Sequence, residues 1–331
     1  MIIQPNFKAA WWLSNPHLQT LYPTLFRRRS VALNIKRERL ITPDNDFIDI
    51  DWCGEGNKPL VILLHGLTGN SNSSYISGMQ HFLLQKGLRS VTLNFRGCSG
   101  EPNRLAKGYH SGETGDLNFV YQTILQRQPD TAMAIIGFSL GGNVLLKWLG
   151  EQANNISLKA AIAVSVPLVL SECATKLDNG FSKFYRYNLI KDLVKYIKTK
   201  QVYLEKIGAG KEADKIKQLG DLSTIKSFWQ YDDQVVARLY GFKDVHDYYK
   251  QSSSRQYLYK IKIPTLIIQS NDDPFMTKKI LPKAEELSSS ITLEVTSKGG
   301  HVGFISGSNP FKPEYWLEKR ILYYLKKNDF C

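Results

Sequence analysis

The chain has 331 residues, of which 43% are hydrophobic and 22% are charged. These fractions are ordinary for a folded globular protein, so they exclude a disordered, collagen-like or coiled-coil chain. The 43 Lys and Arg residues outnumber the 30 Asp and Glu residues, which gives a formal net charge of +13 and favours anionic partners without naming one.

Four cysteines are scattered along the chain, and no two of them form a CxxC pair. In a chain of this length the pattern favours reduced thiols and a cytoplasmic protein over a disulfide framework. Neither the cysteines nor the six histidines cluster at ligand spacing, so we expect no metal site. No segment reaches the roughly 18 consecutive apolar residues of a membrane span, and the N-terminus does not have the pattern of a signal peptide.

The N-terminal arm, residues 1–30, is rich in aromatic residues, contains no acidic residue and has arginines at positions 27–29. Two interpretations stay open. The arm packs on the core, or it contacts anionic lipids through its aromatic and basic side chains. The packed arm is favoured because prolines would interrupt a continuous amphipathic helix at Pro5, Pro16 and Pro23.

From residue 31 the chain alternates between predicted strands and predicted helices. Short apolar runs indicate buried strands, and the stretches between them have helical periodicity. The predicted strands are 35–41, 47–52, 60–64, 90–95, 133–138 and 160–166, and the predicted helices are 75–85, 113–128 and 141–152. This alternation indicates an α/β protein with a mostly parallel sheet that helices cover on both faces.

After Pro167 the alternation stops. Residues 167–262 show amphipathic helical patterns, many aromatic residues and an excess of basic over acidic residues, which is typical of a helical cap inserted in an α/β core. The alternation then returns, with predicted strands at 265–269 and 292–296 and predicted helices near 281–288 and 315–326. We therefore expect the core to comprise residues 31–166 and 263–331.

A Gly-x-Ser-x-Gly motif lies at residues 137–141, where a predicted strand ends and a helix begins. A strand that turns at once into a helix strains the backbone at the serine, and side chains on either side of it would collide. Gly137 and Gly141 remove that collision and leave Ser139 exposed at the carboxyl edge of the sheet. The motif predicts Ser139 as a catalytic nucleophile.

A serine hydroxyl is a weak nucleophile and needs a base, which a carboxylate in turn orients. The candidate base is His301, because flanking glycines let the loop after the last strand bend back over the sheet edge. The other histidines are weaker candidates. His65, for example, follows a buried strand and is expected to order a loop.

The orienting carboxylate should come from the loop after the preceding strand, where Asp272 and Asp273 are adjacent. Neighbouring side chains generally point in different directions. Pro274 favours an extended backbone at Asp273, which makes Asp273 the first choice. Asp272 remains the second choice, and the aspartate that does not orient the base is expected to cap the loop. The chain order Ser, Asp, His is typical of α/β-hydrolases.

Attack on an ester carbonyl creates an oxyanion, which two preformed backbone N–H groups must stabilise. Leu140, directly after the serine at a helix N-terminus, is expected to supply one of them. The other is expected from Leu67, in the loop that follows the buried strand 60–64. Gly66 in that loop leaves room for the substrate.

These motifs resemble the YheT-like branch of the α/β-hydrolase superfamily, which is related to eukaryotic α/β-hydrolase-domain acyl esterases and yeast ethanol acyltransferases. The resemblance spans residues 15–304. The matching segments are Asn15-Pro16-His17-Leu18-Gln19-Thr20, His65-Gly66-Leu67-Thr68-Gly69, Asn94-Phe95-Arg96-Gly97-Cys98-Ser99-Gly100, Tyr109-His110-Ser111-Gly112, Gly137-Phe138-Ser139-Leu140-Gly141-Gly142-Asn143, Asn271-Asp272-Asp273-Pro274-Phe275 and Gly299-Gly300-His301-Val302-Gly303-Phe304.

The resemblance implies an α/β-hydrolase fold and a serine esterase or acyltransferase that acts on short- to medium-chain acyl esters. It also implies that Ser139, Asp273 and His301 form the catalytic triad. Some eukaryotic relatives are phospholipases. The membrane-bound relatives carry an N-terminal anchor for which this sequence shows no counterpart, which argues against a membrane-lipid substrate.

We therefore expect a serine hydrolase of the carboxylesterase class that needs no cofactor and cleaves a small acyl ester. Two alternatives stay open: an acyltransferase that passes the acyl group to an alcohol, and a non-catalytic scaffold of the same fold. Such scaffolds typically lose the serine or the histidine, and both are present here. Nucleic-acid binding would rest on charge alone and is not expected, whereas peripheral membrane contact through the arm and the oligomeric state stay open.

Overall fold

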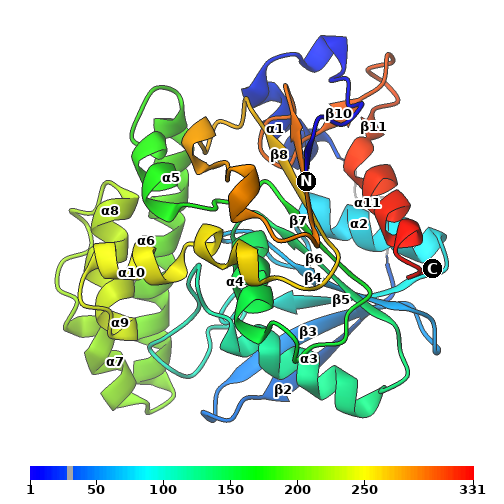
Figure 1. The fold of residues 1–331 in the computed structure, drawn as a ribbon. Coiled ribbons are helices and arrows are strands. Elements are labelled where there is room, and N and C mark those ends of the chain that lie inside the picture. Colours follow the sequence, from blue (N-terminus) through cyan, green and yellow to red (C-terminus); the bar gives the residue numbers. More distant parts are fainter. Residues whose placement is uncertain (28–32) are drawn as a thin grey trace.

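The computed structural model describes residues 1–27 and 33–331, and its centre is a nine-stranded sheet (Figure 1). The strands of this sheet are β1 (Ile2–Ile3), β2 (Ile35–Ile41), β3 (Phe47–Cys53), β4 (Leu60–Leu64), β5 (Arg89–Asn94), β6 (Met133–Phe138), β7 (Ala160–Val164), β8 (Thr265–Ser270) and β9 (Ile291–Thr296). Their order is β1-β9-β8-β7-β6-β4-β5-β3-β2. All pairs are parallel except β2 with β3 and β3 with β5. The expected mostly parallel sheet is present.

The central strands are buried on both faces because they are apolar along their whole length. In β4, Leu60, Ile62 and Leu64 belong to one hydrophobic core, and Val61 and Leu63 belong to the core on the opposite face. Helices α3 (Gly115–Arg127) and α4 (Leu140–Gln152) cover the first core, and helices α2 (Ser74–Gln85) and α11 (Trp316–Lys327) cover the second.

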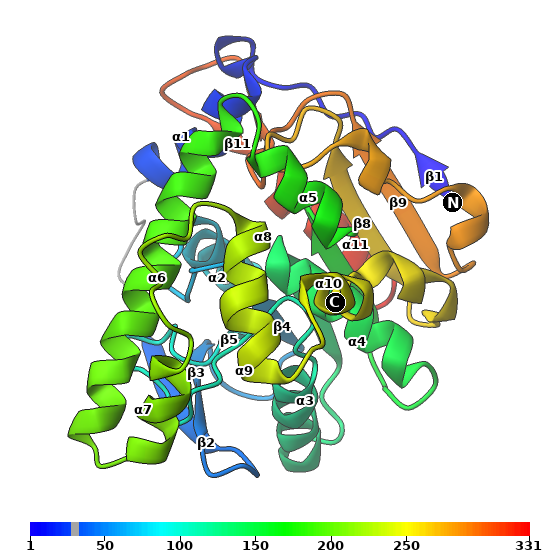
Figure 2. The same ribbon diagram turned by 90° about the vertical axis from the view of Figure 1, so that its left-hand side faces the viewer.

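The chain between β7 and β8 forms what we call the helical segment, residues 170–260, which contains helices and no strand. Its elements are α5 (Leu170–Leu177), α6 (Ser182–Lys206), α7 (Gly210–Lys217), α8 (Phe228–Tyr231), the π-helical turn η2 (Asp232–Ala237), α9 (Arg238–Tyr240), α10 (Val245–Ser252) and the 3₁₀ turn η3 (Ser254–Lys260). Most of these helices lie at the left of the sheet in Figure 1 and face the viewer in Figure 2. They share a hydrophobic core of their own.

The N-terminal residues contact the core at several points. Strand β1 extends the sheet beside β9, and a 3₁₀ turn η1 (Trp11–Leu13) precedes helix α1 (Pro16–Phe26). Contrary to expectation, α1 continues through Pro23. A proline inside a helix removes a hydrogen bond, and the burial of Gln19 and Pro23 offsets this loss. Arg27 pairs with Glu318 on α11, whereas Arg28 and Arg29 lie outside the described residues.

The predicted helix near 281–288 is wrong. The structure has two short 3₁₀ turns there, η4 (Lys278–Ile280) and η5 (Ala284–Glu286). Pro282 lies between them, and a proline both lacks the N–H that a helix needs and disfavours helical geometry in the residue before it. Beyond β9 the strands β10 (Ile305–Ser306) and β11 (Glu314–Tyr315) form a separate antiparallel pair.

Candidate active site

Four loops that carry the candidate residues follow parallel strands of the sheet. Loops after β4, β6, β8 and β9 contain Leu67, Ser139, Asp273 and His301, respectively. Because the carboxyl ends of parallel strands meet at one edge of a sheet, these side chains come together there, as is usual for open α/β sheets.

Ser139 occupies the sharp turn between β6 and α4. Its backbone has φ +51° and ψ −120°, a left-handed conformation that residues other than glycine rarely adopt. A Cβ atom added to Gly137 would lie 2.5 Å from the carbonyl oxygen of Gly141, and one added to Gly141 would lie 2.6 Å from that of His65. The turn therefore depends on both glycines for steric reasons.

Replacing Gly141 by alanine is expected to lower the free energy of unfolding by at least about 1–3 kcal/mol, because the new methyl group must displace buried backbone. Gly210→Ala is the matched control, since a Cβ there meets none of the described atoms within 4 Å. Denaturant unfolding of both variants measures the difference. A loss in Gly141→Ala no larger than in the control would contradict the steric argument.

The side chain of His301 connects Ser139 with Asp273. Its Nε2 atom lies 3.0 Å from Ser139 Oγ, and its Nδ1 atom lies 2.8 Å from Asp273 Oδ2. The Asp273 side chain is almost fully buried, and its other oxygen accepts the N–H of Phe275 at 2.8 Å. The Phe275 ring stacks on the imidazole with a centroid distance of 4.2 Å. These contacts fix the imidazole between a hydroxyl group and a carboxylate.

Asp272 turns away from the histidine ring. Its carboxylate accepts the backbone N–H of Gly300 at 2.9 Å and the hydroxyl of Ser270. It thus ties the loop after β8 to the loop that carries His301. The structure places Asp273, and not its neighbour, beside His301.

The loop after β4 presents one free N–H group beside Ser139. Gly66 and Thr68 donate their N–H groups to the hydroxyls of Tyr75 and Tyr109, each at 2.8 Å. Within the described part of the chain, the N–H of Leu67 between them has no acceptor, and neither has that of Leu140 at the start of α4. A Cβ on Gly66 would lie 3.2 Å from Ser139 Cβ, so a larger residue would crowd the serine.

Two other histidines are buried and neutral. His65 contacts the carbonyl of Gly66 and accepts the N–H of Phe95, and His110 accepts the N–H of Gly112. Burial lowers the pKa of His65 to about 4 and that of His110 to about 3. Both histidines order loops around the site.

These pKa values predict a loss of stability in acid. Between pH 6.5 and 4 the unfolded chain binds more protons than the folded protein, so the free energy of unfolding falls as the pH is lowered. Each of the two histidines contributes up to about 1.4 kcal/mol per pH unit, and this slope fades within about one pH unit above 6.5. Denaturant unfolding at several pH values should show a shallower decline for His110→Asn. A decline parallel to that of the wild type would contradict the prediction.

The N-terminal helix supports the His301 loop through contacts that the sequence does not predict. Thr20 Oγ1 accepts the N–H of His301 at 2.9 Å, and the Gln19 amide bonds both the N–H and the carbonyl of Ile305. A Cβ on Gly303 would lie 2.3 Å from the Gln19 carbonyl oxygen. The segment 15–20 stood out in the sequence, but nothing in the chain order connects it with residues 301–305.

Asn143 on α4 is a second support that the sequence did not reveal. Its side-chain amide donates to the carbonyls of Ser111 and Ser252 at 2.7 and 2.8 Å and accepts the N–H of Ser254 at 3.0 Å. This buried amide ties α4 to the helical segment directly behind Ser139.

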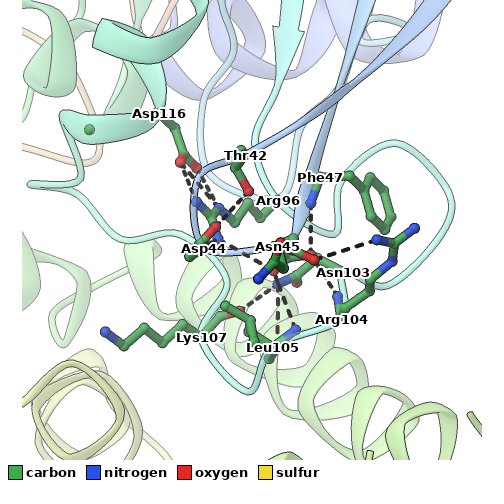
Figure 3. A network of polar contacts seen from close by, with 12 residues as sticks. Thr42, Asp44, Asn45, Phe47, Arg96, Asn103, Arg104, Leu105, Lys107 and Asp116 are labelled. Atoms are coloured by element: carbon green, nitrogen blue, oxygen red, sulfur yellow. Dashed lines mark hydrogen bonds and ion pairs between the residues drawn. The ribbon is translucent and has the colours of Figure 1, made fainter.

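A polar network fastens the loop after β5 (Figure 3). The carboxylate of Asp46 accepts the N–H groups of Phe47 and Arg104 at 2.9 and 2.7 Å. The Nζ atom of Lys200 on α6 donates to Asn103 Oδ1 at 2.6 Å and to the carbonyl of Lys107 at 2.7 Å. These two hydrogen bonds link the second half of α6 to the loop after β5.

A cavity of about 100 Å³ adjoins Ser139 and His301. Apolar side chains from the helical segment and the loop after β8 supply most of its wall, among them Leu170, Leu177, Leu189, Phe228, Phe275 and Met276. Leu67 and Leu140, which carry the two free N–H groups, also line the cavity.

A family model described as alpha/beta hydrolase fold matches residues 59–308. The chain belongs to the α/β hydrolase fold family. This match confirms the α/β-hydrolase fold that the sequence predicted. The Pyrococcus furiosus esterase Pf2001 shares the fold, with a TM-score of 0.54 at 18% identity over 98% of this chain and 99% of that one.

Two relatives indicate the branch of the family to which this α/β hydrolase belongs. The Escherichia coli protein named "Putative esterase YheT" is 38% identical over 93% of this chain and 89% of its own length. The mouse protein named Phospholipase ABHD3 is 28% identical over 95% of this chain and 77% of its own length. The resemblance to the YheT-like branch is confirmed.

Neither a metal cluster nor a spanning helix occurs in the described part of this α/β hydrolase. No group of three or more His, Cys, Asp or Glu side chains there is arranged to hold a metal ion. No helix of the described residues combines the length and the apolar character that crossing a membrane requires.

Proposed function

We propose that this α/β hydrolase is a serine esterase that cleaves short- to medium-chain acyl esters through an acyl-enzyme on Ser139. One observation carries the proposal: His301 contacts Ser139 Oγ with one ring nitrogen and Asp273 with the other, at 3.0 and 2.8 Å. This is the arrangement in which an imidazole takes a proton from serine while a carboxylate holds its tautomer. The names of the relatives, an esterase and a phospholipase, support the same reaction class.

In the proposed first half-reaction, Ser139 Oγ bonds to the ester carbonyl carbon while its proton passes to His301 Nε2. The carbonyl oxygen becomes an oxyanion, which the free N–H groups of Leu67 and Leu140 stabilise. Each such donor is typically worth about 3 kcal/mol of transition-state stabilisation. The carbon–oxygen bond to the alcohol then breaks, and the alcohol leaves with the proton from His301.

In the second half-reaction, water attacks the acyl-enzyme carbonyl. His301 takes one proton from the water and returns it to Ser139 Oγ as the acyl-enzyme bond breaks, which releases a carboxylic acid. Asp273 holds the imidazole through its Nδ1 atom and stabilises the imidazolium that forms twice in the cycle. No cofactor enters this sequence of steps.

The helical segment is proposed as the cap, and the apolar cavity under it as the acyl site. Its volume of about 100 Å³ suits a short to medium chain. Hydrolysis of p-nitrophenyl esters from acetate to laurate is expected to peak at one chain length, because longer chains exceed the cavity and shorter ones leave it partly empty. Equal kcat/KM values across the series would contradict an acyl site here.

A variant that fills the cavity provides the control. Ala174 lines the cavity and is 4% exposed, so Ala174→Leu should reduce the cavity volume without touching Ser139. The optimum is expected to move to a shorter acyl chain, while kcat/KM for the acetate ester changes little. An unchanged optimum would place the acyl chain elsewhere.

A further inference from the structure

The cavity beside Ser139 contains a carboxyl group that the proposed reaction does not use. Asp232 lies at the start of the π-helical turn η2 and contributes to the cavity wall. π-Helical turns inside helices are often found at functional sites. Asp232 Oδ2 accepts one hydrogen bond, from the hydroxyl of Tyr249 at 2.7 Å.

This carboxyl group has no counter-ion in the described part of the chain. Asp232 is partly buried, and burial of its carboxyl group raises the pKa to about 7, whereas the hydrogen bond from Tyr249 opposes this rise. Buried carboxylates are usually paired with a cation, because desolvation is costly otherwise. A positively charged ligand group would supply the missing partner.

A second cavity, of about 80 Å³, shares this wall. Leu67, Leu140, Phe228 and Asp232 line both cavities, so Asp232 stands at the junction between them. One water molecule needs a cavity of roughly 10–15 Å³, so the second cavity has room for a small organic group. It opens beside the reacting centre.

Aromatic and aliphatic side chains share the wall of the second cavity. Six of the aromatic ones are Tyr109, Tyr196, Phe228, Tyr231, Tyr240 and Tyr248. Asp232 is the one carboxyl group among the described residues of this wall, and no Lys or Arg belongs to it. The hydroxyls of Tyr240 and Tyr248 accept backbone N–H groups from Gly108 and Ser111.

We propose that the second cavity binds a small organic cation of the quaternary ammonium or alkylammonium class, with Asp232 as its counter-ion. Aromatic walls attract such cations through their ring faces, and a carboxylate completes the site. The inference rests on the proposed esterase function in one respect: the cation is the headgroup of the ester that is cleaved at Ser139. Asp232 then determines specificity and takes no part in the proton transfers.

Choline and 3,3-dimethyl-1-butanol form a matched pair of probes, because a carbon atom replaces the charged nitrogen in an otherwise similar shape. Both are tested as competitive inhibitors of p-nitrophenyl butyrate hydrolysis. Choline is expected to bind at least about tenfold more tightly than the alcohol. Butyrylcholine should exceed 3,3-dimethylbutyl butyrate in kcat/KM by a similar factor. Equal inhibition by the two probes would overturn the proposal.

Asp232→Asn removes the charge and keeps an oxygen that can accept the Tyr249 hydroxyl. The preference for choline over its neutral analogue is expected to vanish in this variant and to persist in Asp233→Asn. Asp233 is the matched control because it is exposed and accepts the N–H of Val245. A preference that survives in a folded Asp232→Asn variant would overturn the role of Asp232. If that variant does not fold, the wild-type comparison decides.

Calorimetric titration of Ser139→Ala with choline separates this inference from the proposed function. The variant lacks the nucleophile but keeps both cavities. Choline binding without any ester hydrolysis by the wild type would refute the esterase and retain the cation site. Ester hydrolysis without choline binding would retain the esterase and refute the cation site.

Discussion

Ser139→Ala is expected to lower kcat for p-nitrophenyl ester hydrolysis by about a millionfold. The hydroxyl is the atom that bonds to the acyl carbon, so no neighbouring group replaces it. Loss of a triad serine in a well-studied protease has an effect of about this size, and the residual rate comes from the oxyanion donors and substrate binding. The measurement compares kcat of the purified variant with that of the wild type.

The stability of Ser139→Ala is the control for this result. The variant keeps the strained φ of +51°, and a methyl group occupies less space than the hydroxymethyl group. Its thermal unfolding midpoint should therefore stay close to that of the wild type. A folded Ser139→Ala protein with activity within tenfold of the wild type would refute the proposed nucleophile.

Asp273→Asn has the second largest expected effect, a loss of about ten-thousandfold in kcat. The amide cannot hold the imidazole in the tautomer that accepts the serine proton, nor stabilise the imidazolium. Asp272→Asn is the matched control, because an amide oxygen can still accept the N–H of Gly300. Its kcat should change by less than about tenfold.

The comparison of these two aspartates decides between adjacent positions. Equal losses of kcat in both variants would show that catalysis depends on the geometry of the loop and on neither carboxylate in particular. A larger loss in Asp272→Asn would reverse the assignment of the orienting acid. Steady-state kinetics with the optimal p-nitrophenyl ester measures both variants under the same conditions.

Much of the core could be predicted because its signals are local. The run Leu60–Leu64 is apolar at every position, which marks a strand buried on both faces, and the structure places its residues in two hydrophobic cores. The turn at Ser139 could also be predicted from local sequence. Glycines lie two positions before and after the serine, and in the structure a Cβ atom at either glycine would collide with the backbone. Pro274 pointed to the aspartate that the structure places beside His301.

Other features of the site depend on contacts between residues that are far apart in the sequence. The periodicity of apolar residues does not predict such contacts. Thr20 bonds the N–H of His301 across 281 positions, and Asn143 joins α4 to the helical segment across 109 and 111 positions. Asp232 is one of several acidic residues in its segment. Its place in the cavity follows from how α8, α10 and the core pack together, so the sequence alone gave no reason to single it out.

Labelling with a fluorophosphonate tests the central claim most directly. An activated serine displaces fluoride from phosphorus and keeps the phosphonyl group as a stable adduct, which mass spectrometry of digested protein locates. The account predicts one adduct, on the peptide that contains Ser139, and none in Ser139→Ala. An adduct on another residue, equal labelling of the variant, or no adduct on a wild-type protein that hydrolyses esters would contradict it.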